Sequence, residues 1–325
     1  MHVEPEAEVT PTERPIFGLP VDTRILFANH KGVYKRSIER RKTKLLQKLG
    51  FLVHFLDPDE KIVFVAVGCS PYTLLERLTI RAVGLILMKR SLLVFTNKRL
   101  LHIPTSWKFD FRGSLAQILY QDCRQLHIKR GNLVAEYHNG RTEKFTYIPA
   151  CDRDVIKHFQ FAASVSDQRS ANPQRNHLCP NCTEILPARA AACPACGLEF
   201  RTRAKALARS VLLPGGGYFY VNHPFIGIGD ALGESYLVIL ALAMFFVGQH
   251  GDAEATAVFP IVLGALVLEK LLTIYHSNSF LDEFIPTDLK ALLSGRPVRR
   301  PQPEEPPVPV PPGRQGPLED ILSVR

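Results

Sequence analysis

Short apolar runs separated by polar turns occupy the middle of the chain, and this pattern predicts β-strands. Residues 61–67 (KIVFVAV) are rich in β-branched and aromatic side chains, which pack well on the pleated surface of a sheet. Residues 92–96 and 100–103 are two further apolar runs, and the three residues between them predict a tight turn. These runs indicate antiparallel strands joined by hairpins.

The end of this region predicts one more hairpin and then a helix. Residues 133–137 and 144–148 flank an Asn-Gly dipeptide, which favours the tight turn of a β-hairpin. Residues 152–165 place apolar side chains at helical spacing, with Asp152 as the expected N-cap. We therefore predict a β domain over 56–166, built as a small β-barrel or split sandwich with a C-terminal helix.

Two longer apolar runs lie in the last third of the chain. Residues 235–250 hold sixteen residues without a formal charge, counting His as neutral, and residues 255–268 hold fourteen. A membrane-spanning helix needs about 20 residues, so each run must extend past charged residues to cross a bilayer. A short polar link joins the runs and predicts a helical transmembrane hairpin over 225–276. A buried helical hairpin of a soluble protein is the alternative.

Charged residues inside the expected spans need partners. Asp230 and Glu234 are four residues apart, so they share one face of the first helix. Glu269 and Lys270 lie at a similar depth in the second helix. We hypothesise that Lys270 pairs with Asp230 or Glu234, and the alternative is simple placement of these side chains at the interface.

Basic residues flank the expected hairpin on both sides. The net charge of +9, from 40 Lys and Arg against 31 Asp and Glu, suits nucleic acid or an anionic membrane surface. The link between the two apolar runs has no Lys or Arg, so the positive-inside rule places both ends of the hairpin in the cytoplasm. The flanking basic residues are Arg201, Arg203, Lys205 and Arg209 before the hairpin, and Lys290, Arg296, Arg299 and Arg300 after it.

Four cysteines between the β domain and the hairpin form two C-x-x-C pairs. Each pair places two thiolates on one side of a tight turn, and ten residues separate the pairs, as is typical of a zinc ribbon. Four thiolates fill the tetrahedral coordination of Zn²⁺, which predicts a structural rather than a catalytic site. His177 is an additional candidate ligand, although four thiols already suffice. The expected ligands are Cys179, Cys182, Cys193 and Cys196.

The residues around the two pairs refine this prediction. Gly197 follows the second pair, where a positive φ aims backbone N–H groups at sulfur, whereas Thr183 holds the matching position after the first pair. The three cysteines outside the pairs are spread through the β domain. They favour a reducing compartment over a disulfide framework, because seven is an odd count and four cysteines are assigned to metal.

The turn between two of the expected strands carries a resemblance to a known family. Thr96-Asn97-Lys98-Arg99, followed by short strands and an end helix, resembles the bacterial PH-like domains. The resemblance implies a PH-like fold and an association with membrane proteins, and it assigns no ligand. We expect Lys98 and Arg99 to form a solvated turn, with a structural ion pair of Arg99 as the alternative.

The segment before the first apolar run carries a second resemblance. It is similar to the Pro-Gly-x-Gly-x-x-Tyr entry of small bacterial two-helix membrane domains, and Pro214, Gly215, Gly217 and Tyr220 match that motif. The glycines imply a sharp backbone turn at the membrane interface. We expect Tyr218 and Tyr220 at the depth of the lipid headgroups. This segment lacks the Gly-Lys-Ser/Thr ending of a phosphate-binding loop, so such a loop is not expected here.

Three segments outside these units have biased compositions. Residues 31–48 hold eight Lys or Arg and one Glu, which predicts a basic helix that is either a solvated face or attracted to anionic lipid. Residues 1–20 are acidic and proline-bearing and show no signal-peptide pattern. Residues 301–325 are proline-rich and predict an extended tail, acting as a spacer or as a ligand for a partner.

The sequence shows no nucleophile elbow, no H-E-x-x-H motif and no nucleotide loop, so we expect no catalysis. The expected protein is a non-catalytic, multidomain α+β membrane protein of the bacterial cytoplasmic (inner) membrane, multi-pass and with both termini cytoplasmic. Its expected partners are the bilayer, and anionic lipid headgroups or another membrane protein.

A zinc-ribbon nucleic-acid-binding protein tethered to the membrane is the alternative function. It is disfavoured because the ribbon has one Arg and no aromatic stacking residue between its cysteine pairs. The expected order of segments is a disordered tail (1–20), a basic helical segment (21–55), a PH-like β domain (56–166), a linker (167–177), a zinc ribbon (178–200), a basic juxtamembrane and glycine-rich entry (201–224), the hairpin (225–276), a juxtamembrane segment (277–300) and a proline-rich tail (301–325).

Overall fold

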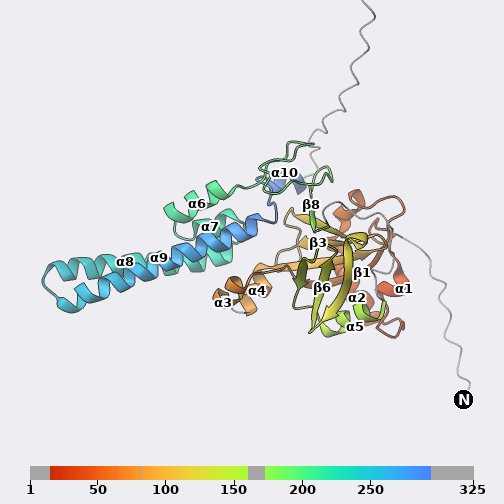
Figure 1. Ribbon diagram of the computed structural model, residues 1–325, viewed down its shortest axis with the longest axis horizontal. Coiled ribbons are helices and arrows are strands. Elements are labelled where there is room, and N and C mark those ends of the chain that lie inside the picture. The colour runs from red at the N-terminus through yellow and green to blue at the C-terminus, as the bar shows by residue number, and fades with distance from the viewer. Residues whose placement is uncertain (1–14, 81, 160–172, 294–325) are drawn as a thin grey trace, which may run out of the picture.

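A β domain and a long helical hairpin form the two ends of the molecule (Figure 1). The computed structural model describes residues 15–80, 82–159 and 173–293. It confirms a mixed α+β architecture with two sheets and two long apolar C-terminal helices. The elements are α1 (Thr23–Leu26), α2 (Arg36–Lys48), η1 (Gly50–His54), β1 (Ile62–Cys69), α3 (Leu74–Thr79), α4 (Ala82–Met88), β2 (Arg90–Thr96), β3 (Arg99–Pro104), β4 (Leu115–Leu119), η2 (Tyr120–Asp122), β5 (Cys123–Lys129), β6 (Asn132–Tyr137), β7 (Thr142–Phe145), α5 (Ala150–Phe159), β8 (Asn176–Leu178), α6 (Arg203–Leu212), α7 (Gly216–Tyr220), α8 (Pro224–Gln249), α9 (Ala253–Leu281) and α10 (Leu289–Leu293).

Two antiparallel sheets make up the β domain. The first has the strand order β1-β2-β3-β4-β8, and the second has the order β5-β6-β7. A β-bridge between Cys69 at the end of β1 and Thr146 after β7 joins the sheets. The predicted strand pairs and the Asn-Gly hairpin are present as β1, β2 and β3 and as β6 and β7.

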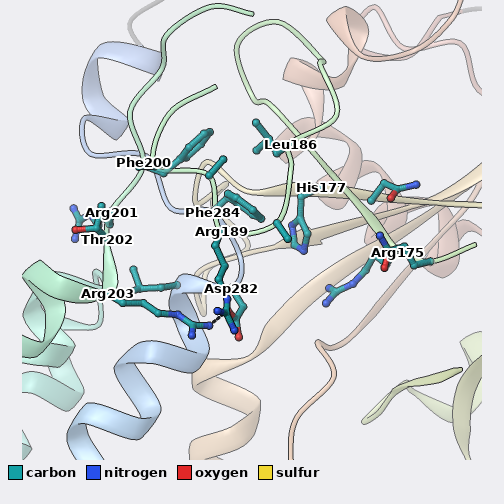
Figure 2. A pocket seen from close by; sticks show the side chains of 16 residues that line it. Arg175, His177, Leu186, Arg189, Phe200, Arg201, Thr202, Arg203, Asp282 and Phe284 are labelled. Carbon is teal, nitrogen blue, oxygen red and sulfur yellow. Dashed lines mark hydrogen bonds and ion pairs between the residues drawn. The ribbon is translucent and has the colours of Figure 1, made fainter. Parts of the chain in front are cut away.

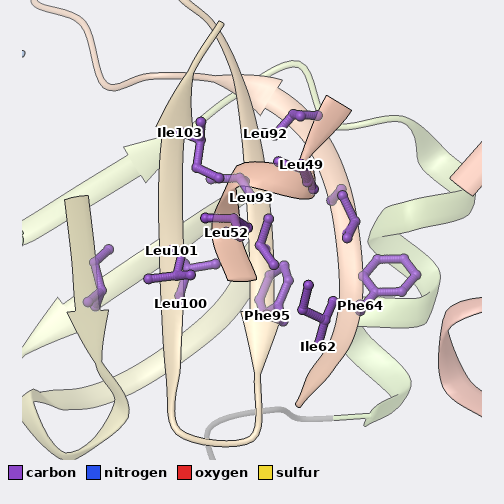
Figure 3. Packing of buried hydrophobic residues seen from close by; sticks show 14 of the residues in the cluster. Leu49, Leu52, Ile62, Phe64, Leu92, Leu93, Phe95, Leu100, Leu101 and Ile103 are labelled. Atoms are coloured by element: carbon purple, nitrogen blue, oxygen red, sulfur yellow. The ribbon is translucent and has the colours of Figure 1, made fainter. Parts of the chain in front are cut away.

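The core of the β domain lies between the sheets and the helices that cover them. Figure 3 shows Leu49 and Leu52, from the end of α2 and from η1, packed against apolar side chains of β1, β2 and β3. Leu93 and Leu101 are fully buried in this cluster. The apolar runs that predicted the strands therefore correspond to a continuous buried core.

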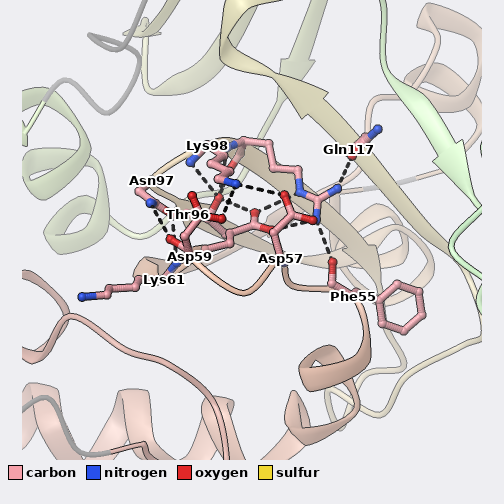
Figure 4. A network of polar contacts seen from close by, with 10 residues as sticks. Phe55, Asp57, Asp59, Lys61, Thr96, Asn97, Lys98 and Gln117 are labelled. Carbon is pink, nitrogen blue, oxygen red and sulfur yellow. Dashed lines mark hydrogen bonds and ion pairs between the residues drawn. The ribbon is translucent and has the colours of Figure 1, made fainter.

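The turn between β2 and β3 is not merely solvated, because Arg99 forms a structural ion pair with Glu60. Figure 4 shows the network of polar contacts around this turn, with Thr96, Lys98 and Gln117 labelled. The Arg99 guanidinium donates to Glu60 Oε1 and Oε2 at 2.9 and 2.7 Å and to the carbonyl of Phe55 at 2.7 Å. Glu60 is fully buried and also accepts from Thr96 Oγ1. The alternative prediction for Arg99 is therefore correct, whereas Lys98 forms exposed ion pairs that contribute little to stability.

The basic helix α2 is part of the β domain and lies on its side away from α8 and α9 (Figure 1). Lys42 is fully buried and its ammonium lies 2.9 Å from Asp152 Oδ1, which Arg41 also contacts at 2.8 Å. Asp152 sits inside the first turn of α5, which begins at Ala150, so the predicted N-cap role is wrong. This buried charge pairing shows that α2 is part of the fold, whereas most of the other basic residues of 31–48 are exposed.

Several segments begin or end at other residues in the structure than the sequence predicted. Residues 15–20 of the predicted tail contribute to the core, since Leu19 is fully buried and bridges to Ile16. The last residues of the predicted linker lie in β8, which pairs with β4. The helix α9 continues into the segment predicted to follow the hairpin. The proline-rich tail and residues 1–14 and 160–172 lie outside the described residues.

Two short helices between β1 and β2 were not predicted. The helix α3 begins with a capping box, in which the Thr73 hydroxyl accepts from the Glu76 N–H and the Glu76 carboxylate accepts from the Thr73 N–H. The helix α4 follows and leads directly into β2. Both project from the β domain toward α8 and α9 (Figure 1).

Candidate metal centre and the base of the hairpin

The four predicted cysteine ligands converge on one point, and we call them the cysteine cluster (Cys179, Cys182, Cys193 and Cys196). Their Sγ atoms all lie within 4.8 Å of one another, and the Cys179–Cys196 and Cys182–Cys193 distances are 3.5 Å. A disulfide would need about 2.05 Å. Four thiolates at about 2.3 Å from a tetrahedral Zn²⁺ lie about 3.8 Å apart, so the cluster fits one metal ion.

Two equivalent turns build this cluster. After each second cysteine, Thr183 (φ 67°) and Gly197 (φ 71°) adopt the left-handed conformation. The N–H of each of these residues donates to the carbonyl of the first cysteine of its pair, at 3.0 and 2.9 Å. Thr183 thus takes the conformation predicted for Gly197, although a threonine side chain disfavours it. The departure from the zinc-ribbon pattern at this position leaves the turn intact.

The thiols have unequal environments. Burial raises the pKa of Cys182 to about 11, and burial also raises the pKa of Cys179. Burial also acts on Cys196, but hydrogen bonds from the Asn181 side chain and the Leu198 N–H lower its pKa overall. A metal ion would have to displace protons from the buried thiols, so metal affinity should fall in acid.

The cysteine cluster connects the β domain to the chain that leaves the hairpin. On one side, β8 runs directly into the first cysteine pair and pairs with β4. On the other side, Phe200 forms a β-bridge with Pro286. The centre of the Phe200 ring lies 5.6 Å from the centre of the Phe284 ring. His177 lies in β8 with its ring 5.0 Å from Phe284, so it packs beside the cluster and is not among the grouped ligands.

The helices α8 and α9 are long and apolar enough to cross a membrane, by length and composition. In the most apolar window of each helix, 11% of the residues are buried. The core helix of a soluble protein would be mostly buried, so the soluble-hairpin alternative is disfavoured. Large side chains such as Leu232, Ile239 and Ile261 are exposed along the hairpin.

The glycines before α8 allow a close backbone approach. Gly215 has φ 66°, and a Cβ at this residue would lie 2.1 Å from the carbonyl oxygen of Gly227 in α8. A Cβ at Gly217 would lie 2.3 Å from the Ser210 hydroxyl. The predicted sharp turn is therefore also a packing contact between α6, α7 and α8.

The two tyrosines expected at headgroup depth are buried within the protein at the base of the hairpin. Tyr218 and Tyr220 are each 5% exposed. The Tyr218 hydroxyl lies 2.7 Å from His276 Nδ1, and the Tyr220 hydroxyl accepts from the Thr202 N–H at 3.1 Å. Helical spacing in α7 turns both rings toward α6 and α9 and leaves Phe219 exposed. The depth of the two tyrosines in a bilayer stays a prediction.

The charged residues inside the hairpin form one polar cluster beneath α6. Lys270 Nζ lies 2.8 Å from Glu234 Oε2 and donates to the Ser210 carbonyl at 2.7 Å. The Gly215 N–H also donates to Glu234 Oε2, at 3.1 Å. The hypothesis that Lys270 pairs with an acid of the first span is therefore supported, with Glu234 as the partner.

The other two acids of the hairpin share a hydroxyl. Thr273 Oγ1 lies 3.1 Å from Asp230 Oδ2 and 3.0 Å from Glu269 Oε1. Carboxylate oxygens of Asp230, Glu234 and Glu269 lie within 4.8 Å of one another, as in a group that could hold a cation. Lys270 supplies one positive charge to this group through its contact with Glu234.

The unpredicted helices α3 and α4 attach to the C-terminal half of α9. The Thr73 hydroxyl lies 2.6 Å from the Tyr275 hydroxyl, and Thr79 Oγ1 lies 2.9 Å from His276 Nε2. A buried ion pair of 2.8 Å joins Glu76 to Lys89, and both side chains contact Ser279. The β domain is therefore held against the hairpin by specific polar contacts.

Comparisons with protein-family models, with curated proteins and with solved structures found no match to this chain.

Proposed function

We propose that this chain is a non-catalytic integral protein of a bacterial cytoplasmic membrane, with both ends of its hairpin in the cytoplasm. The β domain acts as a PH-like binding or scaffold domain, and the cysteine cluster is a structural zinc ribbon. Its partners are the bilayer, and anionic headgroups or another membrane protein. The observation that carries the proposal is the exposed apolar surface on α8, α9, α3, α4 and α6.

The uncharged part of the hairpin is shorter than the hydrocarbon core of a bilayer is thick. The fourteen uncharged residues 255–268 of α9 span about 21 Å, at 1.5 Å per residue. The hydrocarbon core of a bilayer is about 30 Å thick. The apolar band must therefore continue past the polar cluster at Lys270, and the helices that surround this cluster supply the additional apolar surface.

The exposed side chains of these helices fit that role. On α3 and α4, Leu74 and Leu78 are 71% and 74% exposed, and Val83 is 69% exposed. On α6, Val211 and Leu212 are likewise exposed. These helices flank the base of the hairpin on opposite sides (Figure 1). Apolar surface of this kind beside a spanning helix is typical of interfacial helices.

A buried Ser-His pair in the β domain has the contact of a catalytic pair but not its accessibility. Ser70 Oγ lies 2.9 Å from His102 Nε2, a contact that resembles a nucleophile and its base. However, Arg175 lies 2.9 Å from His102 Nδ1 and can only donate, so Nε2 carries the proton and donates to Ser70. Burial lowers the pKa of His102 to about 3, and both side chains are inaccessible. The pair is therefore structural.

A depth measurement tests whether the β domain lies against the bilayer. The chain has one tryptophan, Trp107, so Trp107→Phe provides a background without tryptophan fluorescence. We expect Leu78→Trp in this background to be quenched by brominated lipids when the full chain is reconstituted in vesicles. Tryptophan is favoured at membrane interfaces, so the substitution preserves the proposed contact.

The matched control is Val33→Trp in the same background. Val33 is 56% exposed and lies between α1 and α2, on the side of the β domain away from the hairpin. We expect its fluorescence to be insensitive to brominated lipid. Equal quenching at both positions, or none at position 78, would contradict the proposed docking of α3 and α4 on the membrane.

A further inference from the structure

A cavity of about 540 Å³ lies where the β domain, the loops of the cysteine cluster and the base of the hairpin meet (Figure 2). Its volume falls within the range of about 300–1,000 Å³ that small-molecule sites occupy. Phe200, Phe284 and Leu186 form an apolar side of the cavity, and Arg203 and Asp282 lie opposite them (Figure 2). The function proposed above assigns no ligand to this cavity.

The charge of the lining is strongly positive. Arg175, Arg189, Arg201 and Arg203 all line the cavity, and Asp282 is the one acid among its described lining residues. Two of these arginines are neutralised. Arg203 pairs with Asp282, and Arg175 lies 3.3 Å from Glu143 and 3.7 Å from Glu283.

The other two arginines have no carboxylate partner among the described residues. Arg201 donates to the Asn222 side-chain oxygen at 3.0 Å, and its guanidinium lies 5.3 Å from the centre of the Tyr220 ring. Burial lowers the pKa of Arg201, and the neighbouring Arg209 contributes to the same shift. Arg189 lies at the cavity with φ 61°, and no hydrogen bond or ion pair connects its side chain to a described residue.

We propose that this cavity binds a phosphate-bearing small ligand with an apolar part. The guanidinium of Arg189, which has no described partner, would hold the phosphate, because guanidinium groups donate paired hydrogen bonds to phosphate oxygens. Arg201 would add positive charge at the cavity wall. The rings of Phe200 and Phe284 would hold the apolar part. A soluble nucleotide and an anionic phospholipid both offer this chemistry, and the test distinguishes them.

The test measures binding to the purified full chain in a neutral detergent by isothermal titration calorimetry. One arm titrates inorganic pyrophosphate and adenosine diphosphate, and the other titrates short-chain phosphatidylglycerol against phosphatidylcholine. We expect saturable binding of one equivalent in one of the two arms. We expect the double variant Arg189→Gln and Arg201→Gln to weaken it about tenfold or more, the loss of about 1.4 kcal/mol that one charged hydrogen bond supplies.

Two further variants make the result specific. Lys205→Gln removes an exposed positive charge from α6, outside the cavity. We expect its affinity for the ligand to stay within about twofold of wild type, because exposed charges contribute little to an interaction. Arg189→Gln alone removes a side chain that makes no hydrogen bond or ion pair with a described residue. This variant therefore tests ligand binding without removing a contact that holds the fold. Absence of saturable binding in both arms, or equal weakening by Lys205→Gln, would overturn the proposal.

Discussion

Changing all four residues of the cysteine cluster to serine should abolish metal binding and loosen residues 178–200 between the β domain and the base of the hairpin, while the contacts of α3 with α9 remain. Bound Zn²⁺ contributes on the order of 10–16 kcal/mol in zinc-finger peptides, so we expect this to be the most destabilising variant. Among the named elements, residues 178–200 contain only the last residue of β8, and beside the cysteines they pack through a small apolar cluster with Phe284. Metal analysis and limited proteolysis of the purified full chain measure the effect.

The control is Cys151→Ser, which removes an exposed cysteine outside the cluster. We expect this variant and the wild type each to bind about one metal ion per chain, because four thiolates fill a tetrahedral site. The serine variant of the cluster should still enter the membrane, since the hairpin does not contribute ligands. A wild-type protein that binds no metal, or a serine variant with unchanged proteolysis, would show that the cysteines do not hold this region.

Replacing Lys270 with leucine should destabilise the hairpin more than any other single substitution there. Glu234 is 1% exposed, and Lys270 is its positively charged partner. Removal of one member of a buried ion pair costs about 3–5 kcal/mol, because the remaining charge is left without compensation. The measurement is thermal or denaturant-induced unfolding of the full chain in detergent, followed by circular dichroism.

The double variant Glu234→Gln with Lys270→Leu provides the matched comparison. It removes both charges, so we expect it to be more stable than Lys270→Leu alone. Lys290→Leu, at an exposed position after the hairpin, should be near wild type. Unchanged stability of Lys270→Leu would show that the pair does not support the hairpin.

The features that could be predicted from the sequence are those that a short stretch of residues determines by itself. The cysteine spacing alone identified the four candidate ligands, because C-x-x-C turns bring thiolates together whatever surrounds them. The apolar runs identified α8 and α9, because few other elements have such length and composition. The strands β1, β2 and β3 follow from their apolar runs and from the turn that contains Arg99.

The features that were not predictable depend on contacts between distant segments. The run 82–88 is short and apolar, and such a run does not distinguish a strand from a helix. Burial of Tyr218 depends on His276, which lies 58 residues further along the chain. The cavity is likewise assembled from β8, the loops of the cysteine cluster, α6 and the end of α9, so no single stretch of sequence indicates it.

The cysteine cluster makes contacts with distant segments that its position in the sequence does not indicate. The sequence placed the cluster between a linker and the basic entry to the hairpin. In the structure, β8 ties it to the β sheet, and residues 284–287 tie it to the chain that leaves α9. The cluster thus fastens the β domain to both ends of the hairpin.

Extraction of native membranes tests the central claim that α8 and α9 anchor the chain in a bilayer. The full chain, expressed with a detectable tag, is followed through washes with high salt and then with alkaline carbonate. We predict that it remains in the membrane pellet after both washes and is released by detergent, because its apolar helices lie in the hydrocarbon core. Release by salt would show that charge alone holds the protein at the surface, and would contradict the account.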